Sequence, residues 1–311
     1  MASIMQRWMG QGNEVKSTYT IGERLAGALD ITRPVLSSMG ALGVAGAAAL
    51  AYGGFPPWGQ AVLGLIAALL AFAGIHAFND YADKRRDVVC WPGRPIPSKR
   101  LAAPQALLLA TGSFIAALAI VWCAFNPACF GVSVVAIALG CLYSGYLRDR
   151  VGYLILPPIE GMLWLCGWTA FSPDTLFTSW APWILWLFSV TWQAGHIMVY
   201  SPLHPIQHVE GARLTQVPAL FKRTSPQAAT ILGFIFLWLA AAVGIFLGFY
   251  FDLGLLYLIP TAIMAVVALV ICYRYMRDPE NFAKGIKTFS FATYFMLVAR
   301  IFILISVFLF F

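Results

Sequence analysis

Residues 58–87 read WGQAVLGLIAALLAFAGIHAFNDYADKRRD, an apolar run that ends in acidic and basic side chains. The apolar part is about as long as the roughly 20 residues that a helix needs to cross a bilayer. If the helix continues to its end, Asn79 lies four residues before Asp83, and Asp83 lies four residues before Asp87. Asp80, Asp83 and Asp87 then share one face. The stretch therefore predicts a membrane-spanning helix with carboxylates grouped at one end.

Eight other apolar runs of similar length occupy most of the chain. We therefore predict an all-α integral membrane protein with nine transmembrane helices. Their predicted spans are residues 33–54, 58–79, 104–124, 128–147, 151–172, 180–200, 228–251, 254–275 and 289–311. Because no change of composition marks a second domain, we expect a polar N-terminal segment over residues 1–23 and one membrane domain over residues 24–311.

The composition of the chain excludes several classes of protein. Of its 311 residues, 60% are hydrophobic and only 11% are charged, and the mean hydropathy is +0.79. Soluble domains carry about 25% charged residues. The chain therefore has too little polar surface for a cytosolic enzyme, a nucleic-acid-binding protein or a disordered protein. The net charge of +7 does not indicate nucleic acid as a partner, because the basic residues lie between apolar runs.

These basic residues predict how the chain is oriented. Of the 20 Lys and Arg residues, all but Arg300 lie in the N-terminal stretch or in alternate gaps between the runs. Cytoplasmic loops of membrane proteins are enriched in Lys and Arg. We therefore expect the N-terminus and these loops on the cytoplasmic side. The gap after residues 58–79 is the richest of them and holds Lys84, Arg85, Arg86, Arg94, Lys99 and Arg100.

The carboxylates of residues 80–87 have two interpretations. Like charges at helical spacing repel, so a cation among them is expected. Mg²⁺ takes oxygen ligands, commonly one or two carboxylates together with substrate phosphates. Alternatively, Lys84, Arg85 and Arg86 neutralise the acids on a solvated helix end. The place of the cluster, at the end of an apolar helix and beside a basic loop, favours a phosphate carried on an apolar tail. A nucleotide is not expected, because the chain has no Gly-rich Walker loop.

The pattern Asn-Asp-x-x-Asp-x-x-x-Asp at residues 79–87, with Arg-Pro-Ile-Pro-Ser at residues 94–98, resembles the UbiA family of intramembrane prenyltransferases. Within that family it is most similar to the chlorophyll synthase and digeranylgeranylglyceryl-phosphate synthase branches. Nine helices is also the number typical of the family, so the resemblance extends over nearly the whole chain. Weaker similarities are Arg33-Pro34 at the start of the first span and Tyr143-Ser144 followed by Arg148 and Arg150.

The resemblance implies a prenyl diphosphate substrate and Mg²⁺ as cofactor. Ionisation of the allylic C–O bond leaves a carbocation in an apolar chamber, and a lipophilic acceptor then attacks it. The expected partners are these two substrates and the lipid bilayer; the oligomeric state is left open. We expect the loops near residues 80–103 and 201–227 to cap a central cavity whose active site is on the cytoplasmic side.

The resemblance also assigns roles to particular residues. Asn79, Asp83 and Asp87 are expected to hold the metal, with Asp80 in the same catalytic group. The expected phosphate ligands are Arg94, Arg148 and Arg150. Further substrate-binding residues are expected to be Tyr143, Lys99, His204, His208 and Glu210.

The chain departs from the family after the sixth predicted helix. The family has a second Asp-x-x-x-Asp motif there, whereas residues 200–221 read YSPLHPIQHVEGARLTQVPALF and contain no Asp. His204 and His208 keep the four-residue spacing, and Glu210 is the acid nearest to them. Three readings follow: a transferase that uses these side chains as weaker ligands, a terpene cyclase without a separate acceptor, and a non-catalytic protein that binds an isoprenoid lipid.

Other polar side chains lie inside the predicted spans, where they are costly and often functional. His76 either faces the same cavity as Asp80 or is hydrogen-bonded between helices. Glu160 either faces the chamber or pairs with another helix. Gln193 and His196 are expected close to His204. Arg300 needs a partner that the sequence does not identify.

Overall fold

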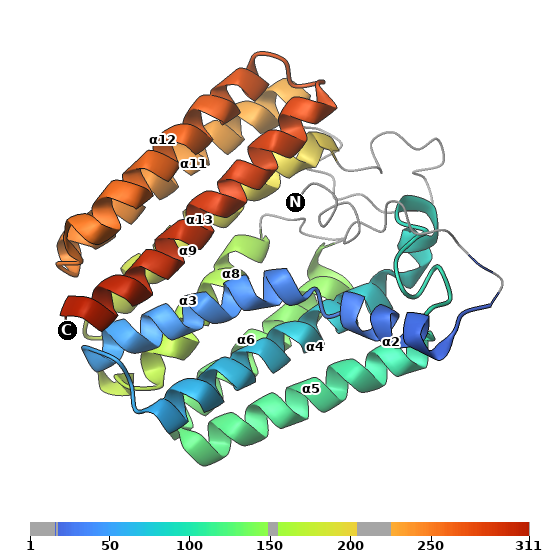
Figure 1. The fold of residues 1–311 in the computed structure, drawn as a ribbon, viewed down its shortest axis with the longest axis horizontal. Coiled ribbons are helices and arrows are strands. Elements are labelled where there is room, and N and C mark those ends of the chain that lie inside the picture. Colours follow the sequence, from blue (N-terminus) through green and yellow to red (C-terminus); the bar gives the residue numbers. More distant parts are fainter. Residues whose placement is uncertain (1–15, 17, 149–154, 204–224, 311) are drawn as a thin grey trace.

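The computed structural model describes residues 16, 18–148, 155–203 and 225–310, and every regular element in these ranges is helical. Nine helices of the described residues correspond to the nine predicted spans, and they form one bundle in Figure 1. They are α3 (Pro34–Tyr52), α4 (Trp58–Cys90), α5 (Ala103–Ala124), α6 (Pro127–Leu142), α8 (Leu156–Thr169), α9 (Ala181–Tyr200), α11 (Pro226–Tyr250), α12 (Gly254–Met276) and α13 (Phe282–Phe310). The predicted all-α membrane fold is confirmed.

Within the described ranges, seven stretches are long and apolar enough to cross a membrane. Helix α8 is not among them because it has 14 residues, about 21 Å at the rise of an α-helix. Helix α9 is not among them either, and most of its side chains are buried inside the protein rather than turned outward. The bundle therefore consists of seven long apolar helices together with α8 and the largely buried α9.

A short helix that the sequence did not predict, α2 (Ile21–Asp30), precedes α3. Thr20 caps it: the side chain of Thr20 accepts a hydrogen bond from the backbone N–H of Glu23, and the Glu23 carboxylate accepts one from the backbone N–H of Thr20. This reciprocal pair satisfies two N–H groups that a helix start leaves unpaired. The expected boundary between residues 23 and 24 therefore falls inside a helix.

Helix α4 continues through the acidic stretch to Cys90 and is 33 residues long. Asn79, Asp80, Asp83 and Asp87 therefore project from one rigid helix. A loop over residues 91–102 follows α4 and returns the chain to α5. Arg100 in this loop forms an ion pair with Asp30 of α2, with 2.6 Å between its Nη1 and Oδ2. This contact fixes the loop at the carboxylate end of α4.

Glycines allow close helix packing in the centre of the bundle, as small residues do in membrane proteins. Helices α3 and α8 cross at Gly167, where a Cβ atom would lie 2.2 Å from the carbonyl oxygen of Val44. Helices α9 and α11 meet in the same way at Gly195 and Gly233. The largest side chains of the core, among them Trp164, pack beside these crossings.

Gly167→Ala is therefore expected to destabilise the protein by about 2 kcal/mol, because the added methyl group forces the backbones of α3 and α8 apart. The matched control is Gly112→Ala on α5, where a Cβ would meet no atom within 4 Å. There the better helix propensity of Ala predicts no loss of stability. Unfolding in detergent, followed by circular dichroism, measures both variants; equal midpoints would contradict the close crossing.

A cavity of about 1090 Å³ lies between α3, α4, α6, α8, α9 and α13, and it is lined largely by apolar side chains. Its polar lining at one end comes from the last turns of α4, with Trp91 and Arg94 from the following loop. The expected central cavity is thus present, and the loop near residues 80–103 contributes to its wall. Most of the second expected cap, residues 201–227, lies outside the described residues. The cytoplasmic orientation stays a prediction.

Candidate active site

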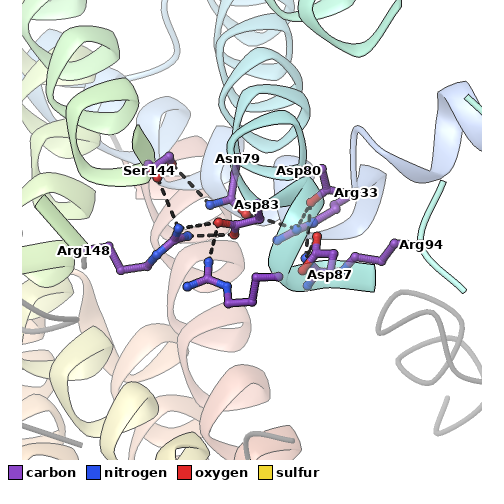
Figure 2. A network of polar contacts seen from close by, with 9 residues as sticks. Arg33, Asn79, Asp80, Asp83, Asp87, Arg94, Ser144 and Arg148 are labelled. Atoms are coloured by element: carbon purple, nitrogen blue, oxygen red, sulfur yellow. Dashed lines mark hydrogen bonds and ion pairs between the residues drawn. The ribbon is translucent and has the colours of Figure 1, made fainter. Parts of the chain in front are cut away.

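The polar end of the cavity is a network of carboxylates and guanidinium groups, drawn in Figure 2. Asp80, Asp83 and Asp87 of α4 are all buried, with 3%, 6% and 1% of their surface exposed. Asn79, Asp83 and Asp87 line the cavity. Asp80 does not line it and instead binds side chains from the start of α3 and from the loop after α4. The spacing of the motif thus separates three cavity-facing groups from one supporting carboxylate.

Asp83 forms a bidentate ion pair with Arg148. The Nη1 atom of Arg148 donates to Oδ2 of Asp83 at 2.7 Å, its Nη2 atom contacts Oδ1, and Arg86 also contacts Oδ1. This planar geometry is the one in which arginine binds carboxylates and phosphates most strongly. Arg148 is itself buried, and its Nη2 also donates to the backbone oxygen of Ser144 at 3.2 Å.

The position of Arg148 depends on an irregular turn at the end of α6. Tyr143–Leu147 form a π-helix, and Arg148 follows directly. Single π-turns are rare and occur often at functional sites, because they rotate the side chains that follow them. Ser144 accepts a hydrogen bond from the amide of Asn79 at 3.3 Å. The guanidinium carbon of Arg148 lies 5.9 Å from the ring centre of Tyr143. This turn thus brings Tyr143, Ser144 and Arg148 to the carboxylates of α4.

Asp87 and Asp80 share Arg94. The Nη1 atom of Arg94 lies 2.8 Å from Oδ2 of Asp87 and 3.5 Å from Oδ1 of Asp80. Burial alone would lower the pKa of Arg94, but the two carboxylates outweigh it and raise the pKa above its ordinary value, so the group stays charged. Its Nε atom is buried and has no hydrogen-bond partner among the described residues. Because Arg94 lines the cavity, it can donate a hydrogen bond to a ligand.

Arg33 completes the network from the start of α3. Its Nη2 atom lies 2.5 Å from Oδ1 of Asp80 and 3.4 Å from the amide oxygen of Asn79. The backbone of Arg33 has φ of 47°, in the left-handed region that non-glycine residues rarely adopt. Such strain persists only where the surroundings hold it and is typical of functional sites. The ion pair with Asp80 and the cap of α3 hold it here.

The expected site residues therefore fall into three groups. The structure brings seven of them together, and all but Asp80 line the cavity: Asn79, Asp80, Asp83, Asp87, Arg94, Tyr143 and Arg148. Lys99 is exposed, has φ of 66° and is not among the lining residues. Arg150, His204, His208 and Glu210 lie outside the described residues.

Arg33 and Arg86 belong to the network but were not among the expected site residues. The sequence signal for Arg33 was its place before Pro34 at the start of a predicted span. Arg86 lies three residues after Asp83, at the spacing of an ion pair on one helix, and it had been assigned only to a solvated helix end.

The side-chain oxygen atoms at the polar end of the cavity are of the type that Mg²⁺ prefers as ligands. Asn79, Asp83 and Asp87 offer hard oxygen ligands from one face of α4, and all three reach the cavity. No group of three or more His, Cys, Asp or Glu residues within the described ranges is arranged to hold a metal ion unaided. Mg²⁺ often binds through one or two carboxylates plus substrate phosphates and water. The site thus fits Mg²⁺ bound jointly with a phosphate ligand.

Five further polar side chains inside the predicted spans were singled out from the sequence. Glu160 and Arg300 form an ion pair, so Arg300 has the partner that the sequence did not identify. Glu160 both lines the cavity and pairs with another helix. His76 lines the cavity, and its Nε2 atom has no hydrogen-bond partner among the described residues, so the expected bond between helices is not seen at that atom. Gln193 and His196 also line the cavity.

Comparisons with known proteins agree with this fold. The model of the UbiA prenyltransferase family matches residues 40–306. Digeranylgeranylglyceryl phosphate synthase of Methanopyrus kandleri is 31% identical over 185 residues, which are 59% of this chain and 64% of that protein. The enzyme of the same name from Methanosarcina mazei is 28% identical over 79% of this chain and 83% of that protein. The protoheme IX farnesyltransferase of Nitrosococcus oceani is 23% identical over 61% of this chain and 69% of that protein.

Two solved structures share the fold. A UbiA homologue from Aeropyrum pernix superposes with a TM-score of 0.71 at 17% identity and covers 86% of this chain and 96% of that one. A UbiA homologue from Archaeoglobus fulgidus, bound to GPP and Mg²⁺, gives a TM-score of 0.57 at 13% identity and covers 89% and 99%. The family match spans most of the chain, including the carboxylates of α4 and Arg148. This chain is therefore a member of the UbiA prenyltransferase family.

Proposed function

We propose that this chain is a membrane prenyltransferase, which ionises a prenyl diphosphate with Mg²⁺ and transfers the prenyl group to a lipophilic acceptor. The observation that carries the proposal is the arginine–carboxylate network at one end of a largely apolar cavity of about 1090 Å³. The polar end suits the diphosphate, and the apolar remainder suits the isoprenoid chain. The names of the relatives, which are a digeranylgeranylglyceryl phosphate synthase and a protoheme IX farnesyltransferase, support the same reaction class.

The charge of the network supports a diphosphate ligand. Its four guanidinium groups, from Arg33, Arg86, Arg94 and Arg148, outnumber its three carboxylates, so the described site has one excess positive charge. One Mg²⁺ ion raises the excess to three. This total balances the roughly three negative charges of a diphosphate ester. A neutral lipid or a free carbocation would not balance it.

The arginines and the carboxylates have separate tasks in this proposal. Asn79, Asp83 and Asp87 hold Mg²⁺, which when bound neutralises the departing diphosphate as a Lewis acid. Arg94 and Arg148 donate some of their hydrogen bonds to phosphate oxygens instead of to the carboxylates. The buried Nε of Arg94 has no partner among the described residues to give up. Asp80 with Arg33 keeps this end of α4 fixed against α3. Donors fixed in place where negative charge develops are the strongest source of catalysis of this kind.

The apolar walls have the second task. After the allylic C–O bond breaks, its electron pair leaves with the diphosphate and the prenyl cation remains. The acceptor supplies the electron pair for the new bond and loses a proton. Side chains such as Phe72, Leu163 and Leu297 line the cavity beyond the polar end. These walls exclude the water that would otherwise capture the cation.

Removal of Mg²⁺ tests the proposal directly. In lipid nanodiscs, the purified chain is expected to release diphosphate from geranyl, farnesyl or geranylgeranyl diphosphate. Chelation of Mg²⁺ with EDTA is expected to lower the rate at least about 100-fold, because several kcal/mol of charge stabilisation are lost. Restoring Mg²⁺ should restore the rate. Calcium at the same concentration is the matched control and should not restore the rate, because Ca²⁺ takes more ligands at longer distances than Mg²⁺.

The products of the same assay separate the three readings of the altered second motif. Prenyl transfer to an added lipophilic acceptor indicates a transferase. A cyclic hydrocarbon or alcohol formed without acceptor indicates a terpene cyclase. If no diphosphate is released under any condition while isoprenoid binding persists, the chain is a non-catalytic descendant and the proposed function is wrong.

A further inference from the structure

The ion pair of Glu160 and Arg300 lies in the wall of the cavity, apart from the carboxylates of α4. The Nη2 atom of Arg300 is 3.6 Å from Oε1 of Glu160, which is longer than a hydrogen bond. The Nη1 atom donates to the backbone oxygen of Met39 at 2.7 Å. Arg300 is 1% exposed, yet both members of the pair line the cavity. The pair thus joins α3, α8 and α13 and faces the enclosed space.

The guanidinium of Arg300 is incompletely bonded. Its Nε and Nη2 atoms have no hydrogen-bond partner among the described residues. The rings of Trp164 and Trp192 lie 5.6 and 5.8 Å from its Cζ atom, so cation–π attraction stabilises the charge without using the N–H groups. Buried donors without a partner are rare in native structures, and charged residues at membrane depth mark binding or transport sites. These two donors are therefore available to a ligand in the cavity.

The pair is well separated from the diphosphate end. Met39, the backbone partner of Arg300, follows Arg33 by six residues along α3, which is about 9 Å at the rise of an α-helix. Arg33 binds Asp80 at the other end of that interval. A molecule that reacts beside the diphosphate and also reaches Arg300 must therefore carry a second polar atom far from its reacting atom.

We propose that Glu160 and Arg300 form a distal subsite that binds a neutral oxygen, a carbonyl or a hydroxyl, of the acceptor. This inference rests on the proposed function, because it concerns the second substrate of that reaction. A carbonyl oxygen accepts from Nε and Nη2 of Arg300, and a hydroxyl can in addition donate to Glu160. An anionic group fits less well, because the pair is neutral as a whole and the Glu160 carboxylate would repel it.

An aromatic wall extends from this subsite along α9 and α13. Trp192 stacks on His196 with ring centres 4.8 Å apart, and His196 stacks on Phe289 at 4.0 Å. The indole N–H of Trp192 donates to the backbone oxygen of Ala292 at 2.7 Å, which fixes the ring. All three rings line the cavity. A flat, ring-containing acceptor with an oxygen at its edge therefore suits the surface next to Arg300.

A pair of probes that differ only in oxygen tests the subsite. Radiolabelled 2,3-dimethyl-1,4-naphthoquinone is bound to the chain in nanodiscs and displaced by the unlabelled quinone or by 2,3-dimethylnaphthalene. The quinone is expected to displace the label at a concentration at least about 10-fold lower, because only it accepts hydrogen bonds from Arg300. Equal displacement by the two compounds in the native chain would overturn the inference without any mutation.

Two variants assign the preference to the pair. Glu160→Leu/Arg300→Met removes both charges together, a change that buried ion pairs often tolerate, and it should abolish the preference for the quinone. Arg300→Lys keeps the cation but not the guanidinium donors, and it should retain less than half of the preference. If either variant folds and keeps the full preference for the quinone, the inference is wrong. The unfolding midpoint of each variant reports whether it is folded.

A crossed control keeps this inference separate from the proposed function. Asp83→Asn should lose release of diphosphate from geranyl diphosphate but keep the preference for the quinone, because Asp83 lies at the other end of the cavity. A native chain that shows the preference but releases no diphosphate would contradict the proposed function alone. A native chain that releases diphosphate but shows no preference would contradict the distal subsite alone.

Discussion

Asp83→Asn is expected to lower Mg²⁺-dependent release of diphosphate by about 100- to 1,000-fold, the range seen when one preorganised electrostatic group is removed from an active site. The substitution keeps the shape of the side chain and removes its charge. Asp83 is a proposed metal ligand, and its carboxylate accepts hydrogen bonds from two N–H groups of Arg148. Its loss therefore weakens both the metal site and the orientation of an arginine proposed to bind phosphate.

The matched control is Asp174→Asn, because Asp174 is exposed between α8 and α9 at the opposite end of the bundle. It should release diphosphate at the native rate. The assay follows diphosphate from geranyl diphosphate at saturating Mg²⁺, with the unfolding midpoint measured in parallel. A folded Asp83→Asn protein with native activity would show that this carboxylate takes no part in the reaction.

Arg300→Met alone is expected to destabilise the protein by about 3 kcal/mol, because it leaves the Glu160 carboxylate in the bundle without its cation. The backbone oxygen of Met39 also loses its hydrogen bond. Unfolding in mixed detergent micelles with increasing sodium dodecyl sulfate measures the change.

The double variant Glu160→Leu/Arg300→Met is the control for this prediction. It should unfold within about 1 kcal/mol of the native chain, since no unpaired charge remains and the apolar side chains pack against the same helices. The single variant Glu160→Leu completes the cycle, and the difference between the double variant and the sum of the two single variants isolates the interaction of the two residues. Equal destabilisation by Arg300→Met and the double variant would show that Arg300 acts through its packing or its bond to α3 rather than through Glu160.

Most of the fold follows from hydropathy alone, because spans of about 20 apolar residues are a strong signal in a chain with so few charges. The boundaries that differ have local causes. Helix α2 is too short and too polar on one face to register as a span. Helix α13 begins at Phe282 rather than at 289 because its first turns, with Lys284 and Lys287, stand beyond the apolar run.

The site was predictable only in part. The spacing of Asp83 and Asp87 on α4 indicates a shared face, since helical geometry is local. The ion pair of Asp83 with Arg148 spans 65 residues of sequence, and the resemblance to a known family, rather than the spacing, suggested that both belong to one site. For Glu160 and Arg300, no pattern links two isolated charges on different helices. Lys99 was expected among the substrate-binding residues, but the turn between Arg94 and Lys99 leaves it exposed.

The length of α4 has a consequence for how the two products depart. Its 33 residues span about 50 Å, whereas the hydrocarbon layer of a bilayer is about 30 Å thick. Asn79 comes 21 residues after Trp58, about 32 Å along the helix. A helix that enters the hydrocarbon layer at Trp58 therefore brings the carboxylates to the opposite headgroup region. Inorganic diphosphate released there enters the adjoining water, while the prenylated acceptor diffuses laterally in the lipid bilayer. The two products thus separate into the aqueous phase and the lipid phase. This separation disfavours the reverse reaction, which needs both products at the site.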